Sequence, residues 1–295
     1  MNFLYDIFSQ HQMFIYLSII YIGLEFFYPI AKKQKFLRKE FRQDVLWYIL
    51  NYIYIDRWLY YLLTYLSFIF LPLWGRYVLY RIAPDSWLRF HALPLKIENV
   101  FLLVLVLFVV IDFLAYWLHR LSHRIPFLWN FHILHHSPKE LDWLSGTRSY
   151  WVDGLLSKLT TAFVLVFIDV SEEGLSILAI WDTHIQLFIH SNIRLRFGPL
   201  EKVFNNTHAH WWHHDVNIHH RYGQNFGQYT VIWDKLFNTY YVEEGYPEKL
   251  GLKDEINYPS GMVARFFYPV LKLSFVSKLL PRQIKLEDDT LGTNE

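Results

Sequence analysis

Long apolar runs alternate with short polar segments along this chain, and the pattern predicts helices that enter a membrane. Residues 12–31 and 99–118 are each long enough to cross a hydrocarbon core of about 30 Å as one helix. Residues 155–190 hold two apolar runs of about 15 residues each, which is short of a full span. A helical hairpin that dips into the bilayer and returns fits this stretch better than two independent crossings.

A fourth apolar stretch, residues 44–74, is too long for one untilted span, and Asp56 and Arg57 interrupt it near the middle. It can form one long tilted helix or two half-length pieces that bend back at the charged pair. We favour the single crossing. The fold expected for the whole chain is all-α: an integral membrane bundle of about four transmembrane helices or helical hairpins.

From about residue 193 the chain becomes polar, rich in histidine and rich in turns, which predicts a helical cap outside the bilayer. Residues 262–280 are amphipathic and suited to lying on the membrane surface, and an acidic disordered tail is expected for 280–295. There is no internal repeat and no Gly/Ser linker. We therefore expect a single membrane domain over residues 1–295, with a core at about 40–270 and an N-terminal transmembrane helix within 1–31.

Composition supports the prediction of a membrane protein, and the distribution of charge predicts on which side of the membrane the cap lies. Aromatic residues make up 20% of the chain and charged residues 19%, below the roughly 25% charged residues of soluble proteins. A formal net charge of +1 gives no reason to expect a nucleic acid partner. Six Lys and Arg residues crowd residues 32–42 directly after the first apolar run, so the positive-inside rule makes that loop and the cap cytoplasmic. The expected protein is a multi-pass one of a bacterial inner membrane or the endoplasmic reticulum.

Histidines carry the candidate chemistry, because the chain has 15 of them and no cysteine. Eight lie in three groups, two of which share the spacing His-x2-His-His, and residues three or four apart share one face of a helix. Imidazole suits zinc, iron, copper and nickel, and eight or nine imidazoles exceed the needs of one ion, so two ions are expected. Ligand type alone leaves iron and zinc open. The groups are His119/His123, His132/His135/His136 and His210/His213/His214.

The ordered strings HRLSH, FHILHH and HWWHH, followed by NFGQYTVIWDKLFNTYY, resemble the fatty acid hydroxylase / sterol desaturase superfamily over residues 40–270. The resemblance implies an integral membrane oxidoreductase with two iron ions. Such an enzyme uses dioxygen as co-substrate to hydroxylate or desaturate a C–H bond of a lipid. Since no haem or flavin domain is present, the resemblance also implies a separate electron donor of the cytochrome b5, ferredoxin or reductase type. Zinc is possible in purified protein.

Carried onto this sequence, the resemblance makes the eight grouped histidines metal ligands and adds His190, which lies in the string HSN. His184 is off the pattern and is expected to support the site or the fold. His219 and His220 are an alternative end of the third histidine group, because the string NFG follows them closely.

Five polar residues are candidates to support the ligands or the substrate entrance, each also open to an ordinary capping or ion-pairing role. A carboxylate within an apolar span is by default functional or paired, and Asp112 is expected to orient His119, seven residues later on the same helical face. The five residues are Asp112, Asp142, Arg148, Asp182 and Asn225.

Two other functions compete with lipid oxidation. A zinc-dependent membrane hydrolase would need a general base beside the metal, and no His-Glu-x-x-His string is present. A histidine-rich metal transporter would distribute its ligands along a path through several spans, whereas these gather at one predicted face.

Overall fold

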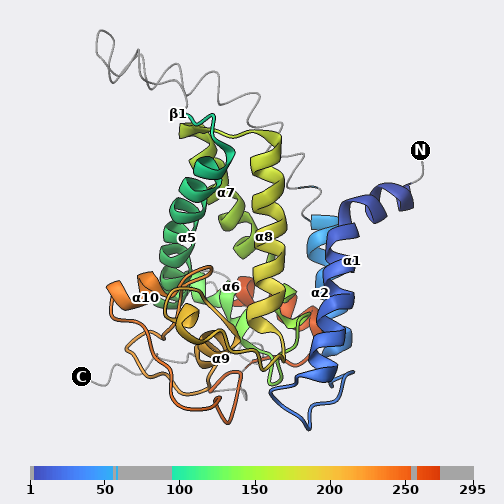
Figure 1. Ribbon diagram of the computed structural model, residues 1–295. Coiled ribbons are helices and arrows are strands. Elements are labelled where there is room, and N and C mark those ends of the chain that lie inside the picture. Colours follow the sequence, from blue (N-terminus) through green and yellow to red (C-terminus); the bar gives the residue numbers. More distant parts are fainter. Residues whose placement is uncertain (1–2, 56–57, 59–94, 254–257, 273–295) are drawn as a thin grey trace.

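The computed structural model describes residues 3–55, 58, 95–253 and 258–272, and the regular secondary structure in these residues is almost entirely helical (Figure 1). The expected all-α fold is confirmed, and the only strands in the described part are β1 (Leu95–Lys96) and β2 (Ile168–Asp169), which pair in parallel. The longer helices are α1 (Phe3–Phe27), α2 (Phe41–Tyr48), α5 (Val100–Arg124), α6 (Pro126–His136), α7 (Trp151–Phe167), α8 (Glu172–His190), α9 (Thr207–His213), α10 (Ile232–Leu236) and α11 (Met262–Leu271).

Helix α5 is central to the helical bundle and packs against α6, α7 and α8. Asn99 caps its first turn, because its side-chain oxygen accepts a hydrogen bond from the Leu102 backbone N–H at 3.0 Å. Among the described residues, α5 alone is long and apolar enough to cross a membrane. The apolar part of α1, Gln12–Phe27, is shorter. Leu103 and Leu107 of α5 are buried, while Phe101 is 79% exposed, as expected of a helix with one face on the bundle.

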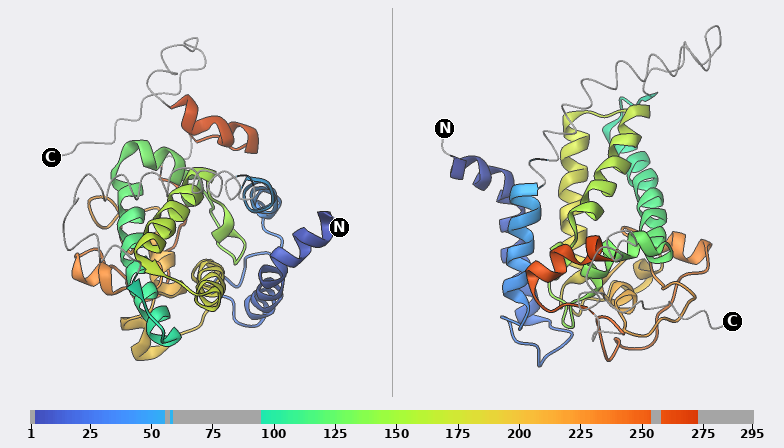
Figure 2. Two further views of the ribbon diagram at one scale, coloured as in Figure 1. Left: turned by 90° about the horizontal axis from the view of Figure 1, so that it is seen from above. Right: turned by 180° about the vertical axis from the view of Figure 1, so that it is seen from behind.

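Helices α7 and α8 form a helical hairpin, as the two short apolar runs predicted. The chain reverses at β2, and Ser171 starts α8 by accepting a hydrogen bond from the Gly174 N–H at 3.2 Å. Figures 1 and 2 show α5, α7 and α8 side by side, with the hairpin's turn at the end farthest from the cap. The hairpin brings the chain back to the cap at His190.

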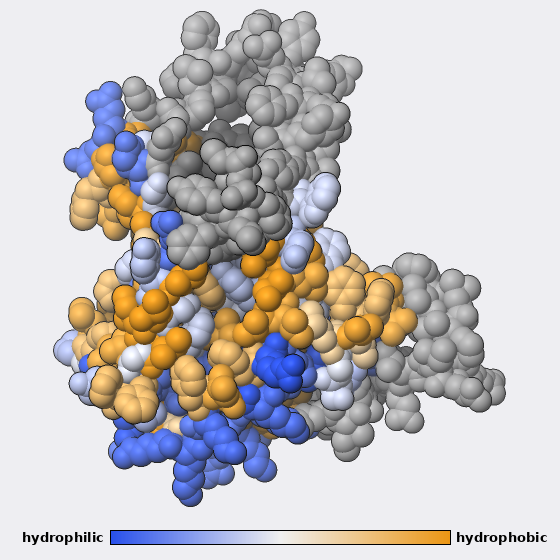
Figure 3. All heavy atoms as spheres, turned by 90° about the vertical axis from the view of Figure 1, so that its right-hand side faces the viewer, coloured by the Kyte–Doolittle hydropathy of each residue, from blue (hydrophilic) through white to orange (hydrophobic). Residues whose placement is uncertain are grey.

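The cap consists of α6, α9, α10 and the loops between them, gathered at one end of the helices (Figure 1). Pro126 occupies the first turn of α6, where its missing N–H costs no helical hydrogen bond, so α6 can begin with only Ile125 between it and α5. Helix α9 packs on the end of α8, and α11 packs on α6. Figure 3 shows hydrophilic residues gathered at the cap end, below a band of apolar surface.

Two expectations concern residues outside the described part of the chain. Residues 41–55 form α2 and a π-helix, Ile49–Ile55, and most of the rest of the expected crossing at 44–74 lies outside the described residues. The expected tail at 280–295 also lies outside the described residues.

Candidate metal centre

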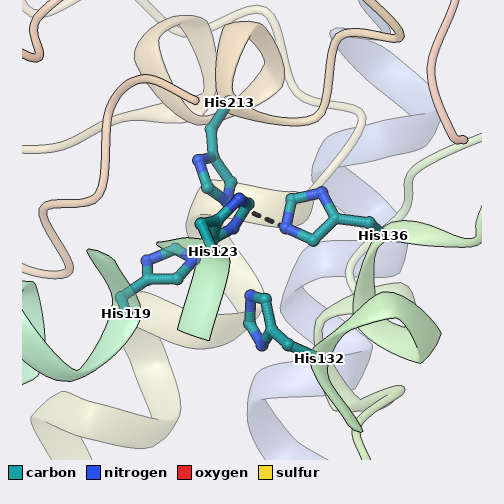
Figure 4. Close-up of side chains that lie close together, drawn as sticks. All are labelled: His119, His123, His132, His136 and His213. Atoms are coloured by element: carbon teal, nitrogen blue, oxygen red, sulfur yellow. Dashed lines mark hydrogen bonds between the residues drawn. The ribbon is translucent and has the colours of Figure 1, made fainter. Parts of the chain in front are cut away.

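Nine histidines converge where α5, α6, α8 and α9 meet, and they form two separate clusters. Within each cluster the ligand atoms lie within 4.8 Å of one another. The five-histidine cluster comprises His119, His123, His132, His136 and His213 (Figure 4). The four-histidine cluster comprises His135, His190, His210 and His214. These are the nine residues that the sequence singled out as ligands.

The clusters follow helix faces and not the sequence groups. Residues four apart on a helix share a face, so α6 directs His132 and His136 into the five-histidine cluster. His135 points about 100° away and enters the other cluster. The third group splits in the same way, because His210 and His214 enter the four-histidine cluster while His213 enters the five-histidine cluster. Each His-x2-His-His group therefore contributes to both clusters.

The spacing of the ring nitrogens fits a metal ion between them. The Nε2 atom of His190 lies 2.8 Å from that of His210 and 3.1 Å from that of His135, and the Nε2 atoms of His136 and His213 are 3.1 Å apart. Metal–nitrogen bonds of about 2.0–2.1 Å at octahedral or tetrahedral angles place neighbouring ligand atoms about 2.8–3.4 Å apart. The Nε2 atoms of His119, His123 and His132 are buried without a hydrogen-bond partner. A cation would satisfy these lone pairs.

The other ring nitrogen of several ligands has a fixed partner, which sets the tautomer that leaves Nε2 free to bind metal. Nδ1–H of His213 donates to the Gln224 carbonyl at 2.6 Å, and that of His190 donates to the Gln186 carbonyl at 2.9 Å. The remaining partners are the Phe226 carbonyl for His119 (3.0 Å), the Arg148 carbonyl for His135 (3.2 Å) and the Asp153 carboxylate for His132 (3.3 Å).

Sequence reasoning missed these supports. Backbone carbonyls leave no signal in the sequence. Asp153 did have one, as a carboxylate at the end of the polar segment that follows the second histidine group.

Burial favours the neutral form of His136, His210, His213 and His214. It lowers the pKa of His213 to about 3, and with neighbouring histidines it holds the pKa values of His136, His210 and His214 well below their usual range. Neutral imidazole is the metal-binding form, so the clusters are ready to bind metal ions at physiological pH.

The less certain histidines lie outside both clusters. His184 on α8 pairs through Nδ1 with the Tyr21 hydroxyl at 2.9 Å, which ties α8 to α1. His219 pairs with Asp215 at 2.8 Å and stacks on Tyr241, and His220 follows it in the same loop. Of the histidines around the third group, the structure brings His210, His213 and His214 into the clusters.

Asp112 does not orient His119. Its carboxylate accepts hydrogen bonds from the Tyr229 backbone N–H (2.7 Å), the Thr230 hydroxyl (2.7 Å) and the Trp233 indole (3.0 Å). The seven-residue spacing does put Asp112 on the same helix face as His119. Its carboxylate, however, is bound by residues of α10 and of the loop before it. Asp112 therefore fastens the cap to α5, which is the paired alternative for a carboxylate within an apolar helix.

The other four candidate supports are also structural through their side chains. Asp182 accepts hydrogen bonds from Gln228 (2.7 Å) and from the Tyr229 hydroxyl (3.0 Å). Asn225, at a φ of 55°, donates to the Ala209 carbonyl at 2.8 Å and so braces α9 from behind.

Asp142 and Arg148 belong to a buried ionic network. The Asp142 carboxylate forms an ion pair with Arg38 at 2.6 Å. Arg148 forms ion pairs with Asp44 and with Glu40, the latter at 3.0 Å. Only Arg148 reaches the metal centre, through the backbone carbonyl that accepts from His135.

Gly146 leaves room for His190, and filling that room gives a test of the four-histidine cluster. A Cβ at Gly146 would lie 2.7 Å from both His190 Nδ1 and the Gln186 carbonyl oxygen. We expect Gly146→Ala to displace the ring and to lower metal affinity or activity by about 10–100-fold, the usual effect of disturbing a ligand's support. Gly261→Ala is the control, because nothing lies within 4 Å of that added Cβ. Equal metal content in the two variants would contradict this packing.

Comparison with known proteins agrees with the site. The family model described as fatty acid hydroxylase matches residues 104–239, a segment that contains all nine clustered histidines. This segment belongs to the fatty acid hydroxylase family. The resemblance drawn from the histidine groups is confirmed.

The curated relatives that this chain matches include proteins named for the oxidation of lipids. Over 158 residues the chain is 31% identical to ornithine lipid hydroxylase OlsE of Rhizobium tropici, which covers 54% of this chain and 44% of the relative. It is 28% identical over 193 residues to human alkylglycerol monooxygenase, covering 64% of this chain and 38% of the relative. It is 29% identical over 151 residues to a putative Delta(7)-sterol-C5(6)-desaturase of Arabidopsis thaliana, covering 48% and 49%.

The chain thus spans less than half the length of each of these relatives. The relatives' names describe hydroxylases, monooxygenases and desaturases, which are oxidoreductases. No solved structure matches the chain.

Proposed function

We propose that this protein is a membrane-bound di-iron oxygenase that hydroxylates or desaturates a lipid. The observation that carries the proposal is the pair of imidazole clusters inside the segment that matches the fatty acid hydroxylase family. In hydroxylation, one oxygen atom of O2 enters the C–H bond and the other leaves as water, which consumes two electrons and two protons from outside. In desaturation, two hydrogens leave the lipid, and with the same two electrons and two protons O2 becomes two waters.

The donor set favours this chemistry over hydrolysis. Both clusters consist of nitrogen donors, and the Asp153 carboxylate that contacts them is hydrogen-bonded to Nδ1 of His132. A hydrolase needs a general base facing the metal-bound reactant. Iron held by such imidazoles supplies the redox capacity to reduce dioxygen and oxidise an unactivated C–H bond.

The chain's own part is to hold, orient and shield. The nine rings would hold two ions, and backbone carbonyls fix the orientation of four of them, those of His119, His135, His190 and His213. Phe226 packs over His119, His123 and His213 and excludes water from the five-histidine cluster. A dry site protects an oxidising reaction from side reactions.

The lipid would approach from the bilayer. We place α5 across the membrane, with α1 and the α7–α8 hairpin beside it and the cap on the cytoplasmic side. Exposed apolar side chains on all of these helices support this placement, among them Ile19, Phe101 and Ile180. The basic residues at 32–42 support the orientation.

Labelled dioxygen tests the function directly. Cells that express the chain should be grown under 18O2, and their lipid extract compared with that of cells expressing His136→Ala. We expect a lipid that gains one 18O atom or loses two hydrogens only with the intact chain, and two irons per chain in anaerobically purified protein. Stoichiometric zinc with full activity in the absence of oxygen would overturn the proposal.

A further inference from the structure

The segment between α1 and α2, residues 28–40, carries an unusual surface at the cap end of the molecule. Within it, Phe36 and Leu37 are 53% and 64% exposed. They lie among exposed cations for which the described residues provide no ion-pair partner. We call this surface the basic loop: Lys32, Lys33, Lys35, Phe36, Leu37, Lys39 and, at the start of α2, Arg42.

The basic loop is held in place by its buried contacts. The Ala31 N–H donates to the Asn192 side chain at 2.8 Å, and the Gln34 amide donates to the Leu141 carbonyl at 2.8 Å. Arg38 turns inward and pairs with Asp142 and Asp44. The exposed charges are therefore mounted on a fixed base, and a partner that binds them would order little additional backbone.

The same contacts connect the basic loop to the four-histidine cluster. Asn192 lies two residues after His190. Arg38 shares the Asp44 carboxylate with Arg148, whose carbonyl accepts the Nδ1–H of His135. Two routes of covalent and hydrogen bonds thus run from the loop to the cluster, one to His190 and one to His135. Electrons tunnel farther along bonded paths than through empty space, so this is a suitable entry point for electrons.

We propose that the basic loop docks an acidic one-electron carrier protein, and that electrons enter at the four-histidine cluster. This rests on the proposed function, which consumes two electrons for each C–H bond hydroxylated. Two reduced carriers each lose one electron, and these electrons with two protons convert the second oxygen atom of O2 to water. Charge complementarity speeds the encounter of two proteins, and the interfaces of electron-transfer complexes are among the smallest between proteins, so a single loop can provide one side of such an interface.

The position of the loop favours a soluble protein over lipid headgroups. Figure 1 places the loop beyond α6 and α9, at the end opposite the hairpin's turn. Figure 3 shows hydrophilic surface at that end, and the apolar band lies above it, nearer the middle of the molecule. A headgroup site would lie at the edge of the apolar band, where the cap meets the helices.

The test compares two sources of electrons for the full chain in nanodiscs of neutral phosphatidylcholine. The protein carriers are reduced [2Fe–2S] ferredoxin of the acidic plant type and the haem domain of cytochrome b5. The small reductant is dithionite with methyl viologen, which needs no docking surface. The variant is Lys32→Glu/Lys33→Glu/Lys35→Glu. The control is Lys202→Glu/Lys249→Glu, which reverses two exposed charges elsewhere on the cap.

We expect the triple variant to raise the KM for the carrier at least about tenfold and to lose its dependence on salt. Its rate with the small reductant should stay within about twofold of the unaltered chain, as should the control's KM for the carrier. Direct titration of the chain with oxidised carrier should show the same weakening without any turnover.

Three results would overturn the proposal. The first is an unchanged KM and unchanged carrier binding in the triple variant. The second is turnover with the small reductant but with neither carrier. The third is weaker binding of the variant to vesicles containing phosphatidylglycerol with an unchanged KM, which would identify a headgroup site. Absence of turnover with every reductant would instead refute the proposed function, and the titration would still test the loop.

Discussion

Replacing His190 by alanine is expected to reduce lipid oxidation by more than about 100-fold and to remove the metal of the four-histidine cluster. Its Nε2 lies 2.8 Å from that of His210 and 3.1 Å from that of His135, so it stands between two other ligands. Disturbing only the support behind a metal ligand already costs about 10–100-fold, and removing the ligand itself should cost more. Metal analysis should show one ion per chain instead of two.

His184→Ala is the matched control, because it removes an imidazole from the same helix. Six residues at about 100° each place His184 and His190 on different faces of α8. His184 contacts Tyr21 and lies outside both clusters, so we expect its variant to keep both ions and most of the activity. Loss of metal from both variants alike would show that helix α8 as a whole, and not the His190 ring, holds the ion.

Eight of the nine clustered histidines could be singled out from the sequence because their signal is local, whereas His190 came from the family resemblance. Histidines at spacings of three and four mark a helix face, and an apolar run of helix length precedes the first of them. The division into two clusters follows the finer helix angles: His132 and His136 lie about 40° apart around α6, whereas His135 lies about 100° from His136. Grouping the residues by string hid this division.

The roles of the supporting residues could not be predicted, because their partners lie far away in the sequence. Asp112 is bound by residues 229–233, and Arg148 is bound by residues 40 and 44. A carboxylate near a histidine in the sequence is as ready to accept bonds from a distant loop as from the ring. His135, His190 and His213 are supported by backbone carbonyls, for which no residue type is diagnostic.

Replacing Arg148 by methionine is expected to destabilise the protein by about 3–5 kcal/mol, the usual cost of breaking a buried ion pair on one side. Arg148 and Asp44 are both 0% exposed, and Asp44 shares its carboxylate between Arg148 and Arg38. A loss of this size corresponds to a fall in melting temperature of at least about 6 °C for a protein of this length. Thermal unfolding in detergent measures it.

Arg196→Met is the matched control for this loss. Arg196 makes two hydrogen bonds to Glu201, at 2.8 and 3.0 Å, but its side chain is 55% exposed. An exposed pair contributes about 0–1 kcal/mol, so the melting temperature should hardly move. Equal losses in the two arginine variants would mean that burial of the Arg148 network has no energetic consequence.

The double variant Arg148→Met/Asp44→Leu separates the buried charge from the packing. Burial raises the pKa of Asp44, while Arg148 and Arg38 lower it, so the single variant leaves a carboxylate that favours protonation. A raised folded pKa makes the destabilisation largest at high pH and smaller as the pH falls and the carboxylate gains its proton. Removing that carboxylate should restore most of the lost stability and abolish the pH dependence, since apolar side chains can replace a buried pair at little cost. A double variant no more stable than Arg148→Met would instead show that the guanidinium's contacts with Glu40 and the Ser137 hydroxyl, and not the charge of Asp44, stabilise this region.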